Sequence, residues 1–188
     1  MICYHGSIVP NLKVLLPFKM PQSNMEESCV YFTAYKPLAA LYIWPRKYMW
    51  LTYGFDKEDN LIYTESHPNA LEEFYRDAKG YIYTCDVAEN DILENKTGIR
   101  IAVAAKGEQK VLECEAVDDA YQKILEYEKA GEIIIRRYGD LTPKELQNNE
   151  NMILSGIKRL DLLKGAHPLS SFVSYKFPEL WEKAKSIG

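Results

Sequence analysis

The chain has few cysteines and histidines, the residues from which zinc sites are built. Its 188 residues include only 4 cysteines and 3 histidines, and no cysteine pair has the C-x-x-C spacing of zinc or redox sites. A glycine-rich phosphate loop and the G-x-S-x-G turn of serine hydrolases are also missing. The sequence therefore predicts no metal site, no P-loop and no hydrolase elbow.

Long apolar runs and a targeting segment are missing as well. No stretch approaches the length of a membrane-spanning helix, and the N-terminus lacks the basic, apolar and small-residue order of a signal peptide. We therefore expect a cytoplasmic protein without a membrane partner. In a reducing cytoplasm the scattered cysteines are expected as free thiols, namely Cys3, Cys29, Cys85 and Cys114.

A strong charge of one sign is the third absence. The 23 basic and 27 acidic residues give a formal charge of -4. This balance argues against a nucleic-acid partner without excluding one, because a large nucleic-acid surface needs clustered basic residues. The adjacent Arg136 and Arg137, in IIIRRYGD, are expected on an exposed edge strand. Composition gives no indication of the oligomeric state.

Tyrosine is the residue that the sequence has in abundance, with 14 tyrosines against 6 phenylalanines. Many of them fall in short runs of β-branched and aromatic residues bounded by turn residues, a pattern typical of strands. These runs predict strands at ICYH, CVYFT, MWLTYGF, LIYTES, GYIYTCDV, IRIAVAA and KVLECEAV. The polar DKEDN between two of the runs predicts a hairpin loop.

Helical patterns interrupt the strands. Residues 36–44 and 67–80 predict short helices that begin near prolines, where a missing N–H costs nothing. Residues 117–131 predict a longer helix, capped at its start by Asp118 and ended by Gly131.

The tail of the chain is predicted to be helical. Thr142 and Glu145 form a capping box with a proline in the first turn, and residues 177–186 predict the last helix. The predicted fold class is α+β, with mainly antiparallel strands. We expect a single domain over residues 1–188, made of a β-rich core in 1–140 and a helical extension packed on it in 141–188.

The stretch CYHGS raises the first functional question. A strand that ends in His5-Gly6 places an imidazole at a sheet edge and leaves the next backbone groups open, because glycine has no Cβ. A carboxamide could be held there by one donor and one acceptor. The alternative is a histidine whose polar atoms are satisfied within an N-terminal strand. Further along, Tyr31 on a strand and Tyr42 on the following helix could face each other across a flat ring.

These motifs resemble those of the ADP-ribosyltransferase superfamily, in the branch of diphtheria toxin and the poly(ADP-ribose) polymerases. That branch is marked by a histidine-tyrosine-glutamate triad. Its first motif is a strand ending in H-G-S or H-G-T, often followed by an asparagine, and its second is Y-F-A, a spacer and a tyrosine on a helix. The matching residues cover about the first quarter of the chain and are His5-Gly6-Ser7, Asn11, Tyr31-Phe32-Thr33 and Tyr42.

The resemblance implies a split, mainly antiparallel sheet and NAD as the substrate. It implies that His5 bonds the adenosine-side ribose and that Gly6 holds the nicotinamide carboxamide through its backbone. Tyr31 and Tyr42 would sandwich the nicotinamide ring, and Ala39 stands where the polymerases usually have a serine. The implied activity is transfer of ADP-ribose to an unknown macromolecular acceptor, or hydrolysis of NAD.

The third motif of that branch is a glutamate at the start of a late strand. The strand that matches is IRIAVAA, where Arg100, Ile101 and Ala102 occupy the candidate positions without a carboxylate. The candidate catalytic carboxylates therefore lie elsewhere, at Glu113 and Glu115, with Glu65 and Glu108 as alternatives. Three interpretations stay open: a transferase, a module of the same fold that binds NAD, ADP-ribose or a protein without turnover, and an α+β protein whose motifs match by chance.

Overall fold

The chain divides into two compact units in a computed structural model that describes residues 1–20, 24–99 and 101–187. The N-terminal unit comprises Met1–Pro45, Phe55–Ile62 and Leu71–Ile134. The C-terminal unit comprises Arg46–Gly54, Tyr63–Ala70 and Ile135–Gly188. The predicted change from β-rich to helical chain near residue 140 falls close to the last crossing between the units.

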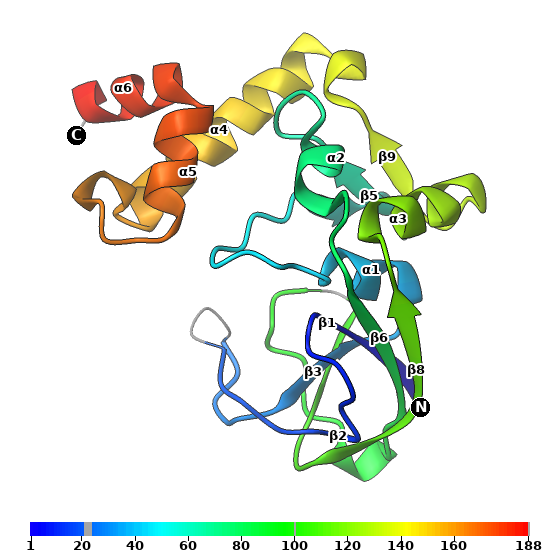
Figure 1. Cartoon of the computed structure of the whole chain (residues 1–188). Coiled ribbons are helices and arrows are strands. Elements are labelled where there is room, and N and C mark those ends of the chain that lie inside the picture. The colour runs from blue at the N-terminus through cyan, green and yellow to red at the C-terminus, as the bar shows by residue number, and fades with distance from the viewer. Residues whose placement is uncertain (21–23, 100, 188) are drawn as a thin grey trace. The chain divides into compact units, whose positions relative to one another are not determined.

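An antiparallel sheet forms the centre of the N-terminal unit (Figure 1). Its strand order is β2-β8-β6-β1-β3-β7. The strands are β1 (Ile2–Ser7), β2 (Val14–Leu15), β3 (Val30–Thr33), β6 (Gly80–Asp86), β7 (Ala102–Ala105) and β8 (Gln109–Val117). The structure thus confirms the α+β class, and the H-G-S and Y-F-T motifs lie on the neighbouring strands β1 and β3.

The strand β1 is joined differently to its two neighbours. Its pairing with β6 runs without a break from Ile2–Asp86 to Ser7–Tyr81. Its pairing with β3 is at Tyr4 and Thr33 in the described part of the chain. The strand β1 is therefore paired with β6 along its whole length, and its pairing with β3 is less extensive.

One face of this sheet carries a hydrophobic core cluster of the N-terminal unit. Side chains alternate between faces along a strand, so Cys3, Tyr83 and Cys85 point to the same side of the sheet. They pack there with Leu15, Val30, Phe32, Val87 and Ala105. All four cysteines are free thiols, and Cys114 is the exposed one.

Three short strands contain the points at which the chain passes between the units. They are β4 (Tyr53–Phe55), β5 (Leu61–Thr64) and β9 (Ile134–Arg136), in the order β4-β5-β9. The predicted hairpin loop between β4 and β5 is confirmed, because Asp56 Oδ1 accepts from the backbone N–H groups of Glu58 and Asn60, each at 2.9 Å. The adjacent arginines lie at and just after the edge strand β9, half-buried rather than exposed.

The helices are α1 (Lys36–Leu41), α2 (Ala70–Tyr75), α3 (Ala120–Lys129), α4 (Pro143–Arg159), α5 (Leu169–Lys176) and α6 (Pro178–Ile187). Every predicted helix is present, but α1 and α2 are shorter than predicted, and α5 was not predicted. Short 3-10 turns lie at Glu89–Asp91, Tyr138–Asp140 and Leu162–Lys164. The capping box of Thr142 and Glu145 is present at α4.

The cap of α3 corrects one prediction. Asp119, not Asp118, precedes the first helical residue, and its Oδ1 accepts from the N–H groups of Tyr121 at 2.9 Å and Gln122 at 3.2 Å. A capping side chain accepts from backbone N–H groups two or three residues after it. Asp118 lies one residue before the capping position, so Asp119 caps the helix instead. Gly131 follows the helix at a φ of 75° and ends it as predicted.

Aromatic rings build the core of the C-terminal unit. Phe172 of α5 lies 5.0 Å from the ring of Tyr48 and 5.1 Å from that of Trp50. Phe177, between α5 and α6, lies 5.7 Å from Trp50. Ring contacts of this kind add about 0.5–1.5 kcal/mol each beyond the area that they bury. This group of rings fixes α5, a helix that the sequence did not predict.

Candidate functional site

The imidazole of His5 is bonded to the neighbouring strand rather than to solvent. Its Nδ1 lies 2.9 Å from the carbonyl oxygen of Tyr31 on β3. Because a carbonyl only accepts, Nδ1 carries the hydrogen. Burial lowers the pKa of the imidazole despite this bond, so the ring is neutral at pH 7. The neutral ring then presents Nε2 as an acceptor.

Gly6 is a glycine because α1 crosses β1 at very close range. A β-carbon built on Gly6 would lie 1.9 Å from the carbonyl oxygen of Ala39 and 3.1 Å from Cβ of Tyr42. No side chain fits in that space. The glycine of the first motif therefore brings the tyrosine at the end of α1 beside β1, although these residues lie far apart in the sequence.

The two tyrosines of the second motif are both half-buried. Tyr42 is the residue that caps the C-terminus of α1. Tyr31 lies on β3, and its hydroxyl accepts from the backbone N–H of Met20 at 3.3 Å. The ring of Tyr31 lies 5.1 Å from that of Phe18, at an angle of 58°. Phe18 is a site neighbour that sequence reasoning missed, since VLLPFKM shows no clear strand or helix pattern.

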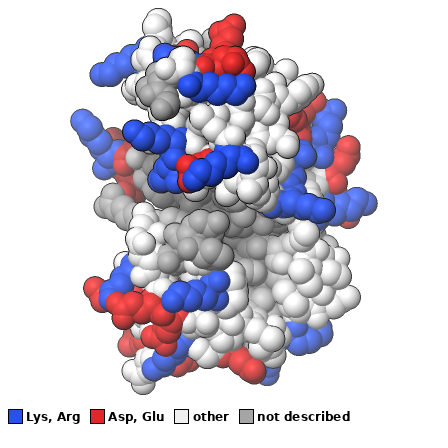
Figure 2. All heavy atoms as spheres, turned by 90° about the vertical axis from the view of Figure 1, so that its left-hand side faces the viewer, with Lys and Arg blue, Asp and Glu red and all other residues white. Residues whose placement is uncertain are grey.

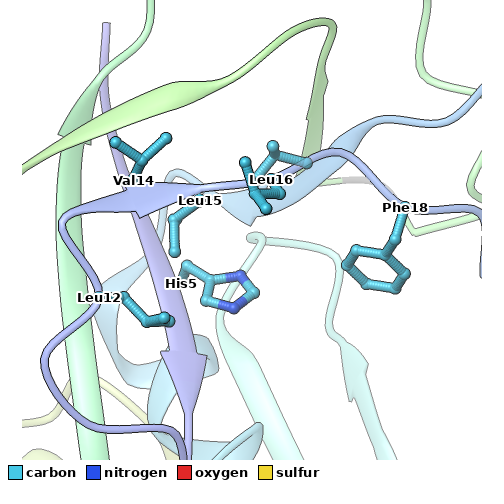
Figure 3. Close-up of a pocket in the computed structure, with 7 residues that line it drawn as sticks. His5, Leu12, Val14, Leu15, Leu16 and Phe18 are labelled. Carbon is cyan, nitrogen blue, oxygen red and sulfur yellow. The ribbon is translucent and has the colours of Figure 1, made fainter.

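A pocket of about 250 Å³ lies beside His5. Figure 3 shows the imidazole among the side chains of Leu12, Leu15 and Leu16. Val14, Phe18 and Val30 complete the lining. Among the described residues of this lining, the imidazole is the only side chain that can form hydrogen bonds. The pocket thus suits a ligand with an apolar body and one donor group.

The segment between β1 and β2 shapes this pocket through local bonds. The Ser7 hydroxyl accepts from the N–H of Val9 at 3.1 Å, and Asn11 is exposed with a left-handed φ of 59°. The buried hydroxyl of Tyr83 donates to the carbonyl of Val9 at 2.6 Å and accepts from the N–H of Leu12 at 3.3 Å. Ser7 and Asn11 thus turn the chain, and Tyr83, which sequence reasoning did not single out, holds the turn.

Two of the candidate carboxylates lie on the face of the sheet away from the His5 side chain. Gly6 pairs with Ile82, and Ile82 pairs with Glu115, so Glu115 shares the face of Gly6 and α1. His5 points to the opposite face because it precedes Gly6. Glu113 lies two residues before Glu115 on the same face and is exposed.

Glu115 is engaged by two lysines. Its Oε2 lies 2.6 Å from Nζ of Lys36, and its Oε1 lies 2.7 Å from Nζ of Lys123. Partial burial raises the pKa of the Glu115 carboxyl, but the two lysines outweigh this and lower it overall. The carboxylate is therefore ionised and occupied on both oxygens.

The other two candidates lie in different surroundings. Glu108 is exposed in the turn between β7 and β8. Glu65 is only 4% exposed and belongs to the C-terminal unit. Its Oε2 accepts from the backbone N–H of Tyr138 at 2.9 Å, and its own N–H donates to the carbonyl of Arg136 at 3.0 Å. This pattern of bonds ties β5 to the chain after β9.

The strand expected to carry the third motif lies beside the strand of Tyr31. Ala102, the first residue of β7, pairs with Thr33, and Ala104 pairs with Tyr31. Arg100, another candidate position, lies outside the described residues. The place next to Thr33 therefore carries a methyl group and no carboxylate.

Comparison with models of known protein families, with curated proteins and with solved structures gave no match. The interpretation of the site therefore depends on its own geometry. Within residues 1–20, 24–99 and 101–187, no cluster of His, Cys, Asp and Glu could hold a metal ion. No helix in those ranges is long and apolar enough to cross a membrane. On the face shown in Figure 2, basic side chains are interspersed with acidic ones rather than gathered in one patch.

Proposed function

We propose that the N-terminal unit binds NAD at a site made by His5, Gly6, Tyr31 and Tyr42, and that the chain is an ADP-ribosyltransferase-like protein. One observation carries the proposal. The H-G-S strand β1 and the Y-F-T strand β3 are neighbours joined by the bond of His5 to the Tyr31 carbonyl, and Tyr42 at the end of α1 lies against Gly6, on the face opposite the His5 side chain. A chance match of two short motifs gives no reason for their strands to be neighbours.

Each of these residues has a role that suits NAD. The neutral His5 ring presents Nε2, which accepts a hydrogen bond from a ribose hydroxyl. Gly6 lies where β1 is paired with β6 on one side and more open toward β3 on the other. Its backbone groups suit the carboxamide of nicotinamide. The half-buried rings of Tyr31 and Tyr42 supply flat apolar surface for the nicotinamide ring.

The proposed reaction is cleavage of the bond between nicotinamide and ribose. The ADP-ribosyl group passes either to a macromolecular acceptor or to water, and nicotinamide leaves with the electron pair of the broken bond. The sugar gains positive charge as the bond breaks. A carboxylate near the ribose stabilises that charge in the family that the motifs resemble.

A second function, binding without turnover, is favoured by the residue at the start of β7. Ala102 stands beside Thr33 where the resemblance implies a glutamate. Loss of one group that stabilises charge in the transition state typically costs about 100-fold or more in rate. A module that binds NAD or an ADP-ribosylated partner fits this substitution.

The test measures NAD binding by calorimetry and nicotinamide release by chromatography in the wild-type chain. His5→Ala and Tyr42→Ala are compared with Tyr175→Ala, which changes a tyrosine that is 82% exposed in the C-terminal unit. We expect His5→Ala and Tyr42→Ala to weaken NAD binding about 10-fold or more, because each loses a direct contact. Tyr175→Ala should bind as the wild type does.

The outcomes separate the candidates. Release that disappears in His5→Ala establishes an NAD-cleaving enzyme. Binding without release favours the module without turnover. Unchanged binding in Tyr42→Ala contradicts the nicotinamide sandwich, and a wild-type chain that binds no NAD contradicts the proposal as a whole.

A further inference from the structure

We propose that Glu115 is a positioning residue for the NAD site: through Lys36 it holds α1, and with it Tyr42, against β1. This inference rests on the proposed function and adds a residue that none of the motifs contains. It assigns Glu115 a role through another side chain, not a contact with the substrate.

The ion pairs of Glu115 join the sheet to two helices. One carboxylate oxygen faces Lys36 at the start of α1 at 2.6 Å, and the other faces Lys123 of α3 at 2.7 Å. The Glu115 side chain is 31% exposed, so solvent screens these pairs less than it screens pairs on an open surface. Each oxygen thus has its own lysine, and the two helices are fixed independently.

The helix α1 needs such an anchor because its own start is weak. It has only 6 residues, and Tyr35 at the N-cap makes no side-chain capping bond. Helices of this length are not stable by themselves in water. Lys36 also places a cation at the positive end of the helix dipole, which is unfavourable unless an anion compensates it. Glu115 supplies that anion.

Two further contacts of α1 lie toward the end that carries Tyr42. At the other end of the helix, the hydroxyl of Tyr75 donates to the carbonyl of Leu41 at 2.9 Å. In the middle, the carbonyl of Ala39 lies against Gly6 with no space for a methyl group. Loss of the Lys36 pair leaves the start of α1 held by the hydroxyl of Tyr35, which donates to the carbonyl of Glu132 at 2.5 Å. We expect the loosened helix to shift and to move Tyr42 at its C-terminus.

The register of the sheet places this anchor in line with the site. Gly6, Ile82 and Glu115 form one row across β1, β6 and β8. Gly6 and Glu115, the two ends of the row, contact α1, the first at Ala39 and the second at Lys36. The row therefore sets the height and the tilt of α1 above the sheet.

The test compares the affinity for NAD with the affinity for ADP-ribose in the full chain. ADP-ribose lacks nicotinamide, so its binding does not depend on Tyr42. Lys36→Met and Glu115→Gln should bind NAD about 5- to 10-fold more weakly, the effect of losing a partly buried ion pair, with ADP-ribose affinity unchanged. The double variant should be no weaker than either single variant, since both remove the same interaction.

Two controls make the test specific. Lys123→Met removes the other ion pair of the same carboxylate, and it should change NAD affinity by less than about twofold. Lys36→Arg keeps the cation and should bind NAD as the wild type does. If Lys36→Met fails to fold, the nearly isosteric Glu115→Gln gives the same comparison.

The failure of the inference differs from the failure of the proposed function. If the wild-type chain binds neither NAD nor ADP-ribose, the proposed function is wrong and the inference falls with it. If the wild type binds both and Lys36→Met matches it, the inference alone is wrong. Equal weakening of NAD and ADP-ribose would mean a general structural role, which also overturns the inference.

Discussion

His5 and His67 show how differently the two units use the same side chain. His67 is 5% exposed, and its Nδ1 lies 3.1 Å from the hydroxyl of Ser66, which itself accepts from Nε1 of Trp50 at 3.0 Å. The ring centroids of Phe172 and Phe177 lie 6.2 and 5.8 Å from that of His67. His5 is only half-buried and lines an open pocket. The C-terminal unit encloses His67 among rings, whereas in the N-terminal unit His5 lies beside an open pocket.

The carboxylates repeat this contrast. Glu65 of the C-terminal unit is buried, and its Oε2 accepts from a backbone N–H group. Glu115 of the N-terminal unit joins two helices to the sheet and remains partly accessible. The three predictions below test this difference.

The largest effect is expected from Phe172→Ala in the C-terminal unit. The ring is 9% exposed and contacts those of Tyr48, Trp50 and Phe177. Its removal should lower the free energy of unfolding by about 4 kcal/mol, because it leaves a cavity among rings. Urea unfolding followed by tryptophan fluorescence measures the change.

The matched control for Phe172→Ala is Tyr175→Ala on the same helix, which should stay within about 0.5 kcal/mol of the wild type. In conditions where Phe172→Ala is folded, its NAD affinity should equal that of the wild type. A loss of NAD affinity without unfolding would show that the two units are not separate in function.

An intermediate effect is expected from Gly6→Ala in the N-terminal unit. The new methyl group meets the backbone of Ala39, so α1 must move, at a cost of about 2 kcal/mol. Gly54→Ala, in β4, is the control, because nothing lies within 4 Å of a β-carbon there. We expect Gly6→Ala to lower both the stability and the NAD affinity, and Gly54→Ala to lower neither. Equal stability of the two variants in urea would show that α1 does not lie as close to β1 as described.

The smallest effect is a pH dependence that originates at His5. Burial lowers the pKa of its imidazole below the ordinary 6.5. The unfolded chain therefore takes up the proton first, and the stability that the neutral ring provides is complete above pH 6.5 and is lost as the pH falls toward the folded pKa. The free energy of unfolding, measured from about pH 7.5 to about pH 5, should fall more steeply in the wild type than in His5→Gln. Parallel curves would contradict this origin.

The strands were predictable from sequence where local composition decides them. The β-branched and aromatic runs located β1, β3 and β6, and the capping box located the start of α4. The two-residue β2 was not predictable, because it carries no periodicity and is defined by its pairing of Val14 with Lys110 far along the chain. The helix α5 was not predictable either, because it is short and lies between prolines. The ring contacts that stabilise it form only in the folded unit.

The candidate site was predictable to a similar degree. The motifs located His5, Gly6, Tyr31 and Tyr42, and the structure brings their segments together. The roles of the carboxylates were beyond the sequence, because they depend on strand order and register. Only the pairing of Gly6 with Ile82, and of Ile82 with Glu115, shows which face Glu115 occupies.

The bond from His5 to the carbonyl of Tyr31 has a consequence for the motions of the sheet. On its β6 side β1 is closed by a continuous backbone ladder, but toward β3 a side chain forms part of the link. A rotation of the imidazole removes the side-chain part of that link and leaves the pairing of Tyr4 with Thr33 as its backbone part. Local openings that need few broken bonds are the most frequent ones in a folded protein. The β1–β3 pairing should therefore open more often than the other strand pairings of the sheet. Amide hydrogens between β1 and β3 should exchange with solvent before those between β1 and β6.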